Sequence, residues 1–215
     1  MNLNLGISDL DLEKLKSCSI IFHAAASVRF DDPLKKAVLL NTRGTRETCR
    51  LAMTMPNLKA FVHVSTAYIQ PKNFYVKEQL YEPDGDWKSY IDFAEKLDEN
   101  LMNSLGLKLT EFAPNTYVFT KHMAEQVCVD YKEQFNLPII IFRPSIVTIT
   151  ERDPFCGWCD NLNGPGGLVF AAAFAITHVS TFPGDNQMDL VPSDICVKAI
   201  IIAAFKMGRD RGLEM

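Results

Sequence analysis

Tyr117 and Lys121, four positions apart, have side chains of the types that transfer protons in active sites. They lie in the stretch Pro114-Asn-Thr-Tyr-Val-Phe-Thr-Lys121, and on a helix this spacing places both on one face. A lysine ammonium beside a phenol favours the phenolate, so we expect Lys121 to lower the pKa of Tyr117. Tyr117 would then donate or accept a proton near neutral pH.

The same spacing occurs a second time, at Tyr68 and Lys72. Pro71 lies inside that match, and a proline removes a helical hydrogen bond and clashes with the preceding turn. Short motifs also arise by chance, so the structural context decides what they mean. Of the two pairs, only Tyr117 and Lys121 lie in a long helical pattern.

Buried strands and helices alternate along the chain. Apolar runs typical of strands buried on both faces span residues 19–24, 59–65 and 137–142. Capping residues, prolines and glycines mark the ends of the expected helices. These helices cover residues 33–55, 87–105, 114–135, 167–178 and 193–207, and Gly106 is expected to end the second. Residues 66–90 are expected to form a long loop, and residues 143–166 an irregular stretch.

This alternation predicts an α/β fold with a doubly wound parallel sheet, covered by helices on both faces. Such sheets bind ligands at the carboxyl ends of their strands. Those ends carry Ala24-Ala-Ala26, Ser65-Thr66 and Pro144-Ser145. We therefore expect these residues to meet at one edge of the sheet, beside Tyr117.

Composition narrows the class of protein. A 215-residue chain with 47% hydrophobic and 22% charged residues suits one globular domain with a full core. The net charge is −4 and the 22 Lys and Arg residues are scattered, which argues against a nucleic-acid partner. The start of the chain lacks the basic and apolar regions of a signal peptide. Six dispersed cysteines are interpreted as buried thiols of a reducing compartment.

The most apolar stretch, residues 167–176, is too short to span a bilayer. We expect it to form a buried helix, with a helix at a membrane interface as the alternative.

Several residues have both a structural and a functional interpretation. The hydroxyl of Thr66 or Ser65 can polarise a carbonyl beside Tyr117 or simply cap a strand end. Asn41 is interpreted as a structural hydrogen-bonding residue within a helix. His23 and His63 are expected to be satisfied core histidines, because no partner has the spacing of a metal ligand. Cys156 and Cys159 match Cys-x-x-Cys, but without a second pair they are expected to be ordinary thiols rather than a redox or zinc site.

Five segments together resemble a known family, the alcohol-forming fatty acyl-CoA reductases, particularly the insect type. This family belongs to the extended short-chain dehydrogenase/reductase superfamily, which has a Rossmann-like fold. The resemblance covers nearly the whole chain. The segments, in the family's order, are Phe22-His-Ala-Ala-Ala-Ser-Val-Arg-Phe-Asp31, Phe61-Val-His-Val-Ser-Thr-Ala-Tyr68, Pro114–Lys121, Arg143-Pro-Ser-Ile-Val147 and Gly157-Trp-Cys-Asp-Asn-Leu-Asn-Gly-Pro165.

The resemblance implies a two-step, NADPH-dependent reduction of a long-chain fatty acyl-CoA to an aldehyde and then to a fatty alcohol. It implies that Tyr117 protonates the developing alkoxide and that Lys121 lowers its pKa and binds the nicotinamide ribose. Thr66 would polarise the carbonyl, with Ser65 as the alternative. The residues expected to bind the cofactor are Ala24, Ala25, Ala26, Ser65, Tyr117, Lys121, Pro144, Ser145 and Ile146.

The family's Gly-rich phosphate-binding turn is not found here: the first 43 residues contain one glycine, Gly6. We therefore interpret the chain as an N-terminally truncated NAD(P)-binding domain that continues, from about residue 148 to 215, into the start of a substrate-binding region. The resemblance also implies a peroxisomal or endoplasmic reticulum location inside the cell, with membrane association through a C-terminal part beyond this chain. The alternatives are another extended short-chain enzyme, acting on a sugar nucleotide or steroid, or a non-catalytic remnant that binds a partner.

Overall fold

The structure is a computed structural model that describes residues 3–73, 75–81, 85–179, 181, 185 and 187–213. It consists of two compact units. The first contains residues 1–143 and 203–215, and the second contains residues 144–202. The predicted functions of the two regions, cofactor binding and substrate binding, stay predictions.

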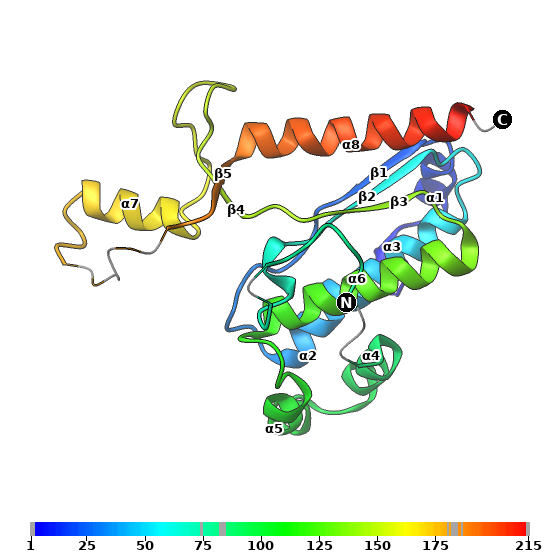
Figure 1. The fold of residues 1–215 in the computed structure, drawn as a ribbon. Coiled ribbons are helices and arrows are strands. Elements are labelled where there is room, and N and C mark those ends of the chain that lie inside the picture. The colour runs from blue at the N-terminus through cyan, green and yellow to red at the C-terminus, as the bar shows by residue number, and fades with distance from the viewer. Residues whose placement is uncertain are drawn as a thin grey trace. The chain divides into compact units, whose positions relative to one another are not determined.

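A parallel three-stranded sheet is the centre of the first unit (Figure 1). Its strands, in the order β1-β2-β3, are β1 (Ile20–His23), β2 (Ala60–Val64) and β3 (Ile139–Phe142). His23 lies beside His63, and Val64 lies beside Phe142, so the carboxyl ends of the strands are level with one another. The three predicted strands and their parallel arrangement are confirmed.

Helices cover one face of this sheet. In Figure 1, α3 and α6 form a layer against the strands, and α4 and α5 lie beyond that layer. On the opposite face of β1, Ile20 and Phe22 are 44% and 49% exposed, so this part of the sheet is not covered as expected. The helical segments of the unit are η1 (Leu3–Gly6), α1 (Asp9–Leu15), α2 (Leu34–Ala37), η2 (Val38–Arg43), α3 (Gly44–Met53), η3 (Ala67–Ile69), α4 (Trp87–Lys96), α5 (Glu99–Leu109) and α6 (Thr116–Phe135).

The hydrophobic core lies between the sheet and this helical layer. Phe119, Met123 and Val127 follow one another at four-residue spacing along α6, so they share the face that packs inward. They meet Phe61 of β2 and Ile139 of β3. All five side chains are at most 2% exposed, so α6 is held firmly against the strands.

The helix predicted for residues 33–55 forms as one continuous run from Leu34 to Met53, but its middle, η2, is a π-helix. Such segments are rare and often occur at functional sites. Asn41 lies within η2.

The prediction of one helix over residues 87–105 is wrong. The segment forms two helices, α4 and α5, that meet between Leu97 and Asp98. The Asp98 carboxylate accepts a hydrogen bond from the backbone N–H of Leu101, which starts a new helix at this point. Gly106 does not end the helix, because α5 continues to Leu109.

The second unit contains a two-stranded parallel sheet and an apolar helix. Strands β4 (Ile146–Thr148) and β5 (Leu190–Pro192) pair along their length, and β4 was missed in the sequence because its three residues lie in an expected irregular stretch. Helix α8 (Ser193–Leu213) begins in the second unit and ends in the first.

Helix α7 (Pro165–Ala173) contradicts the expectation of a buried apolar helix. It has no buried residue, and Val169 is 67% exposed. The aromatic rings of Phe170 and Phe174 contact each other, with centroids 4.3 Å apart. High hydrophobicity alone does not bury a helix, because burial needs a partner surface.

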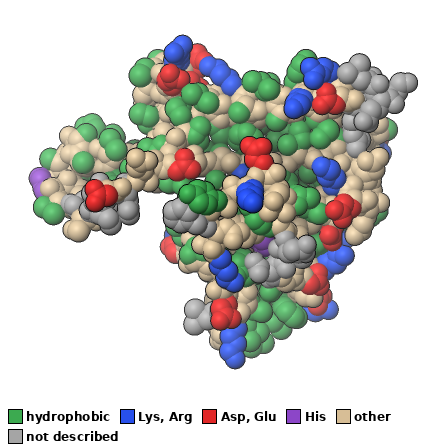
Figure 2. All heavy atoms as spheres, in the orientation of Figure 1, with side chains coloured by type: hydrophobic (Ala, Val, Ile, Leu, Met, Phe, Trp, Pro, Cys, Tyr) green, Lys and Arg blue, Asp and Glu red, His purple; other side chains and the backbone are tan. Residues whose placement is uncertain are grey.

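The six cysteines are free thiols, but only Cys49, Cys128 and Cys196 are buried, so the interpretation of all six as buried is wrong. Cys156 and Cys159 are both exposed. Figure 2 shows acidic and basic side chains interspersed over the visible face. Among the described residues, no helix combines the length and the apolar run that a membrane crossing requires.

Candidate functional site

Tyr117 lies in the first turn of α6, near the carboxyl ends of β1 and β2. The Asn115 side chain caps this helix by accepting a hydrogen bond from the backbone N–H of Val118, at 2.9 Å. The ring of Tyr117 packs against that of Phe30, which follows β1, with centroids 5.7 Å apart. The phenol is therefore held by its position at the helix start and by a contact with a neighbouring loop.

Thr66 and Tyr117 are brought together as expected. The Thr66 side chain lies near enough to the phenol to affect its pKa, and Thr66 itself is buried at the end of β2. Burial raises the pKa of Tyr117 above its ordinary value, and the neighbouring Thr66 side chain lowers it by a smaller amount. The expected lowering by Lys121 is therefore wrong: desolvation of the phenol dominates. A raised pKa keeps the phenol protonated, which suits a proton donor.

Lys121 follows one turn after Tyr117 and points to the end of β2. Its ammonium donates a hydrogen bond to the Val64 carbonyl at 2.7 Å, and the residue is 4% exposed. Burial lowers the pKa of Lys121 to about 8, while Cys128 and Glu125 act in the opposite direction. The ammonium is thus buried beside the site with one hydrogen bond to the backbone, and its protonation changes in a range close to neutral pH.

This burial predicts a pH-dependent stability difference between the wild type and Lys121→Met. The unfolded chain holds the Lys121 proton up to its ordinary pKa of 10.5, whereas the folded chain releases it at about 8. The unfolded state binds more protons between these values, so wild-type stability relative to Lys121→Met rises with pH across this window, by about 3 kcal/mol. Denaturant unfolding at pH 7 to 10.5 measures this difference.

Lys96→Met is the matched control, because Lys96 is an exposed lysine paired with Asp92 on α4. Its stability difference from wild type is expected to stay flat across the same pH range. A flat difference for Lys121→Met as well would contradict the burial of a charged Lys121.

Two histidines near Lys121 are buried, as the sequence predicted. The His23 and His63 rings contact each other, with centroids 5.3 Å apart. The Thr45 hydroxyl donates to the Asn41 carbonyl at 2.7 Å and so accepts from His23 Nε2 at 3.0 Å, which fixes the tautomer of His23. Burial, and to a smaller extent the charge of Lys121, lowers the pKa of His23 to about 4. The same two causes lower the pKa of His63 well below its ordinary value. Both are therefore neutral at physiological pH.

The expectation that both histidines are satisfied is wrong for His63. Neither ring nitrogen of this residue, which is 1% exposed, has a hydrogen-bond partner among the described residues. The Ser65 hydroxyl, two residues along the same strand, is likewise buried without a partner in the described part of the chain. His63 and Ser65 point to the same face of β2 because side chains alternate along a strand. They therefore flank Val64, whose carbonyl holds Lys121.

Small residues lie at the carboxyl end of β1. Ala24 and Ala25 are exposed and Ala26 is partly buried, so this segment offers backbone and methyl groups to a ligand. Asn41 supports the next residue, Ser27: its carbonyl accepts from the Ser27 N–H at 2.8 Å, and its amide donates to the Ser27 carbonyl at 3.0 Å. The same amide donates to Thr120 Oγ1 on α6. Asn41 is thus a structural hydrogen-bonding residue, as expected, and ties the loop after β1 to the helix that carries Tyr117.

Pro144, Ser145 and Ile146 belong to the second unit. Their predicted contact with a cofactor stays a prediction.

Two charged residues near the site were missed in the sequence. Glu125 lies one turn beyond Lys121 on α6, and Arg143 follows β3 directly. Arg143 donates two hydrogen bonds to the Glu125 carboxylate, at 2.9 and 2.7 Å. The four-residue spacing from Lys121 to Glu125 could have indicated that Glu125 shares this helix face. Arg143, the partner of Glu125, lies 18 residues further along the chain, and no sequence periodicity connects Arg143 with Glu125.

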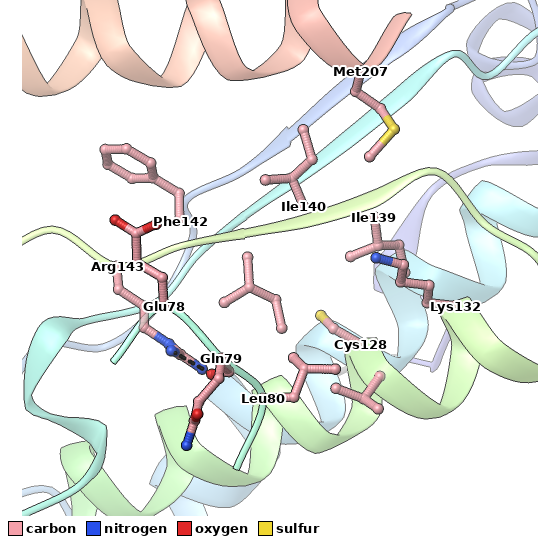
Figure 3. A pocket seen from close by; sticks show the side chains of 12 residues that line it. Glu78, Gln79, Leu80, Cys128, Lys132, Ile139, Ile140, Phe142, Arg143 and Met207 are labelled. Carbon is pink, nitrogen blue, oxygen red and sulfur yellow. Dashed lines mark hydrogen bonds between the residues drawn. The ribbon is translucent and has the colours of Figure 1, made fainter. Parts of the chain in front are cut away.

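A cavity of about 550 Å³ lies along β3, away from Tyr117 (Figure 3). Its walls come from β3, α6, the segment Glu78–Leu80 and Met207. Neither Thr66, Tyr117 nor Lys121 is among the described residues that line it. The candidate site is therefore defined by converging polar groups at the strand ends rather than by this cavity.

A protein family and several known proteins match nearly the whole chain. The family described as "Male sterility protein" matches residues 1–200. The chain is 40% identical to "Fatty acyl-CoA reductase wat" of Drosophila melanogaster and 42% identical to "Fatty acyl-CoA reductase 1" of Homo sapiens. Each match covers 96% of this chain and 40% of the relative, so the chain spans less than half the length of these relatives.

Solved structures share the fold. The UDP-glucuronic acid 4-epimerase from Bacillus cereus in complex with NAD has a TM-score of 0.65 and 17% identity, over 93% of this chain and 53% of that one. The terminal R domain from the myxalamid PKS-NRPS biosynthetic pathway has a TM-score of 0.62 and 24% identity, over 93% and 43%. These likenesses establish a Rossmann-like α/β fold.

Proposed function

The chain belongs to the male sterility protein family, alongside the fatty acyl-CoA reductases that it matches, and we propose that it forms the proton-donor part of a fatty acyl-CoA reductase. One observation carries the proposal: the Thr66 side chain acts on the Tyr117 phenol at the end of β2, with buried Lys121 one turn along the same helix. This group of residues lies at the carboxyl ends of parallel strands, where α/β sheets bind their ligands.

The proposed reaction has two reductions that balance. In the first, a fatty acyl-CoA thioester takes one hydride and one proton, the carbon–sulfur bond breaks, and coenzyme A leaves as the thiol, giving the aldehyde. In the second, the aldehyde takes another hydride on carbon and a proton on oxygen to give the alcohol. A nicotinamide cofactor supplies both hydrides when it is bound.

The side chains of this chain have distinct tasks in both steps. The Thr66 hydroxyl orients and polarises the carbonyl oxygen, and Tyr117 delivers a proton to that oxygen as negative charge develops. The raised pKa of Tyr117 keeps its proton in place until then. The Lys121 ammonium, which bonds the Val64 carbonyl, is proposed to hold the nicotinamide ribose.

The residues present fit a nicotinamide cofactor. Exposed Ala24 and Ala25 offer a surface without bulky side chains at the end of β1. The buried Ser65 hydroxyl has no partner among the described residues, and Lys121 has donors beyond the one that bonds Val64. Ala26, Tyr117, Pro144, Ser145 and Ile146 complete the proposed binding set. The preference for NADPH over NADH, and a peroxisomal or endoplasmic reticulum location, are part of the proposal and rest on the family resemblance.

We expect the full-length protein to oxidise NADPH when it is given palmitoyl-CoA, and to release coenzyme A and hexadecanol. Cofactor absorbance, thiol titration and mass spectrometry of the lipid measure the three quantities. The control replaces palmitoyl-CoA with a sugar nucleotide or a steroid ketone. Turnover of the control alone would assign the site to another class of short-chain enzyme, and NADH acting as well as NADPH would remove the cofactor preference.

A further inference from the structure

The face of α6 that carries Tyr117 and Lys121 continues to Glu125. The three residues are spaced four apart, so they form one row along the helix. Glu125 is 2% exposed, and a carboxylate so deeply buried requires a charged or hydrogen-bonding partner. That partner is Arg143, whose guanidinium meets both carboxylate oxygens in a two-pronged contact.

Arg143 has a second set of contacts, with the loop that follows Thr66. Its Nη1 donates to the Gln79 carbonyl at 2.9 Å, as Figure 3 shows, and its guanidinium lies over the Tyr81 ring, 5.5 Å from the centroid. One turn of α6 also contacts this loop directly, because the Gln126 amide donates to the Tyr81 carbonyl at 3.1 Å. A single side chain therefore joins the end of β3, the helix α6 and the loop Lys77–Tyr81.

Glu125 also contributes to the charge around Lys121. Burial lowers the pKa of Lys121, and Cys128 and then Glu125, on its own helix, raise it by smaller amounts. The neutral rings of His23 on β1 and His63 on β2 face it from the sheet. Glu125 is the only carboxylate among the described residues that raises the pKa of Lys121, and Arg143 counters part of its charge.

We propose that Glu125 and Arg143 are positioning residues of the site. The pair fixes the helix face with Tyr117 and Lys121 to the end of β3 and to the loop after Thr66, and it places a carboxylate one turn from Lys121. The expected effect of the pair on turnover rests on the proposed reductase function. The mechanical part of the inference, that Arg143 holds the loop, does not.

The pH profile of turnover separates positioning from simple folding. Because the charged Lys121 is proposed to hold the cofactor, loss of its proton is expected to limit activity at high pH in the wild type. Glu125→Gln removes a charge that favours the ammonium and is expected to move this upper limit to lower pH. Arg143→Gln leaves the carboxylate unpaired beside Lys121 and is expected to move it up. Shifts in opposite directions would not result from a merely destabilised fold, whereas no shift, or shifts in one direction, would overturn the proposal.

Trypsin cleavage after Lys77 tests the mechanical part without any measurement of turnover. Arg143→Gln releases the loop, so this cleavage is expected to be about tenfold faster than in the wild type, in line with a loss of about 1.4 kcal/mol of local protection. Unchanged cleavage would overturn the role of Arg143 in holding the loop. If the wild type shows no acyl-CoA reduction, the proposed function fails while this result still decides whether the pair holds the loop.

Glu47→Gln is the matched control. Glu47 is also a buried carboxylate held by arginines, Arg46 and Arg50, but on α3. Its loss is expected to leave both the upper pH limit and cleavage after Lys77 unchanged. An equal shift in this control would assign the effects of Glu125→Gln to general destabilisation and overturn the proposal.

Discussion

Replacing Tyr117 with phenylalanine is expected to lower the rate of acyl-CoA reduction by about 10²–10⁴-fold, the range for loss of a general acid. The ring and its contact with Phe30 are kept, so the variant should fold and bind substrate. Only the proton that the phenol delivers to the carbonyl oxygen is lost. The measurement is the steady-state rate with palmitoyl-CoA in the full-length protein, together with its melting temperature.

Tyr131→Phe is the matched control for this change. Tyr131 lies on the same helix, is 9% exposed and packs in the hydrophobic core, far along α6 from the strand ends. The control removes the same oxygen atom and should leave the rate close to that of the wild type. Equal rates for Tyr117→Phe and the wild type would remove Tyr117 from the mechanism.

The second large effect is expected for Thr66→Val, with a loss of about 10²-fold in turnover. Valine keeps the shape of threonine and removes only the hydroxyl that acts on the Tyr117 phenol. The loss should be mainly in kcat, because the hydroxyl acts on the developing charge of the carbonyl oxygen. Thr66→Ser restores a hydroxyl and is expected to recover most of the activity.

Ser65→Ala tests whether the hydroxyl of Ser65 or that of Thr66 polarises the carbonyl. Ser65 is buried and its hydroxyl has no partner among the described residues, whereas Thr66 is the residue that affects the pKa of Tyr117. We therefore expect Ser65→Ala to lose less turnover than Thr66→Val. A larger loss in Ser65→Ala would transfer the carbonyl-polarising role to Ser65.

Much of the site could be predicted from the sequence because parallel strands bring their carboxyl ends together. Apolar runs located the three strands, and the residues at their ends followed by position. Thr66 and Tyr117, which are 51 positions apart by their numbers, meet for this reason. The one-turn spacing placed Lys121 on the same helix face.

The electrostatics could not be predicted in the same way. The sequence indicated a lowered pKa for Tyr117, but the phenol is buried and the Lys121 ammonium bonds the Val64 carbonyl instead. How far a group is desolvated depends on packing around it, and a short motif does not specify packing. The pairing of Glu125 with Arg143 depends on tertiary structure for the same reason.

Outside the site, the errors also have local physical causes. Asp98 starts a new helix by capping it, which overrode the amphipathic pattern that suggested one helix through Gly106. Helix α7 is apolar yet exposed. The hydrophobicity of a segment indicates that burial would be favourable, but it does not show whether another surface packs against the segment.

The central claim is that this site reduces a fatty acyl-CoA in two hydride transfers. It is tested most directly by turnover of palmitoyl-CoA in the full-length protein with NADPH carrying two deuterium atoms at C4 of the nicotinamide. Two deuterium atoms at C1 of the hexadecanol product, which forms about 10²–10⁴-fold more slowly in Tyr117→Phe, are the predicted result. Hexadecanol without deuterium, or deuterium in the Tyr117→Phe product at the wild-type rate, would contradict the account.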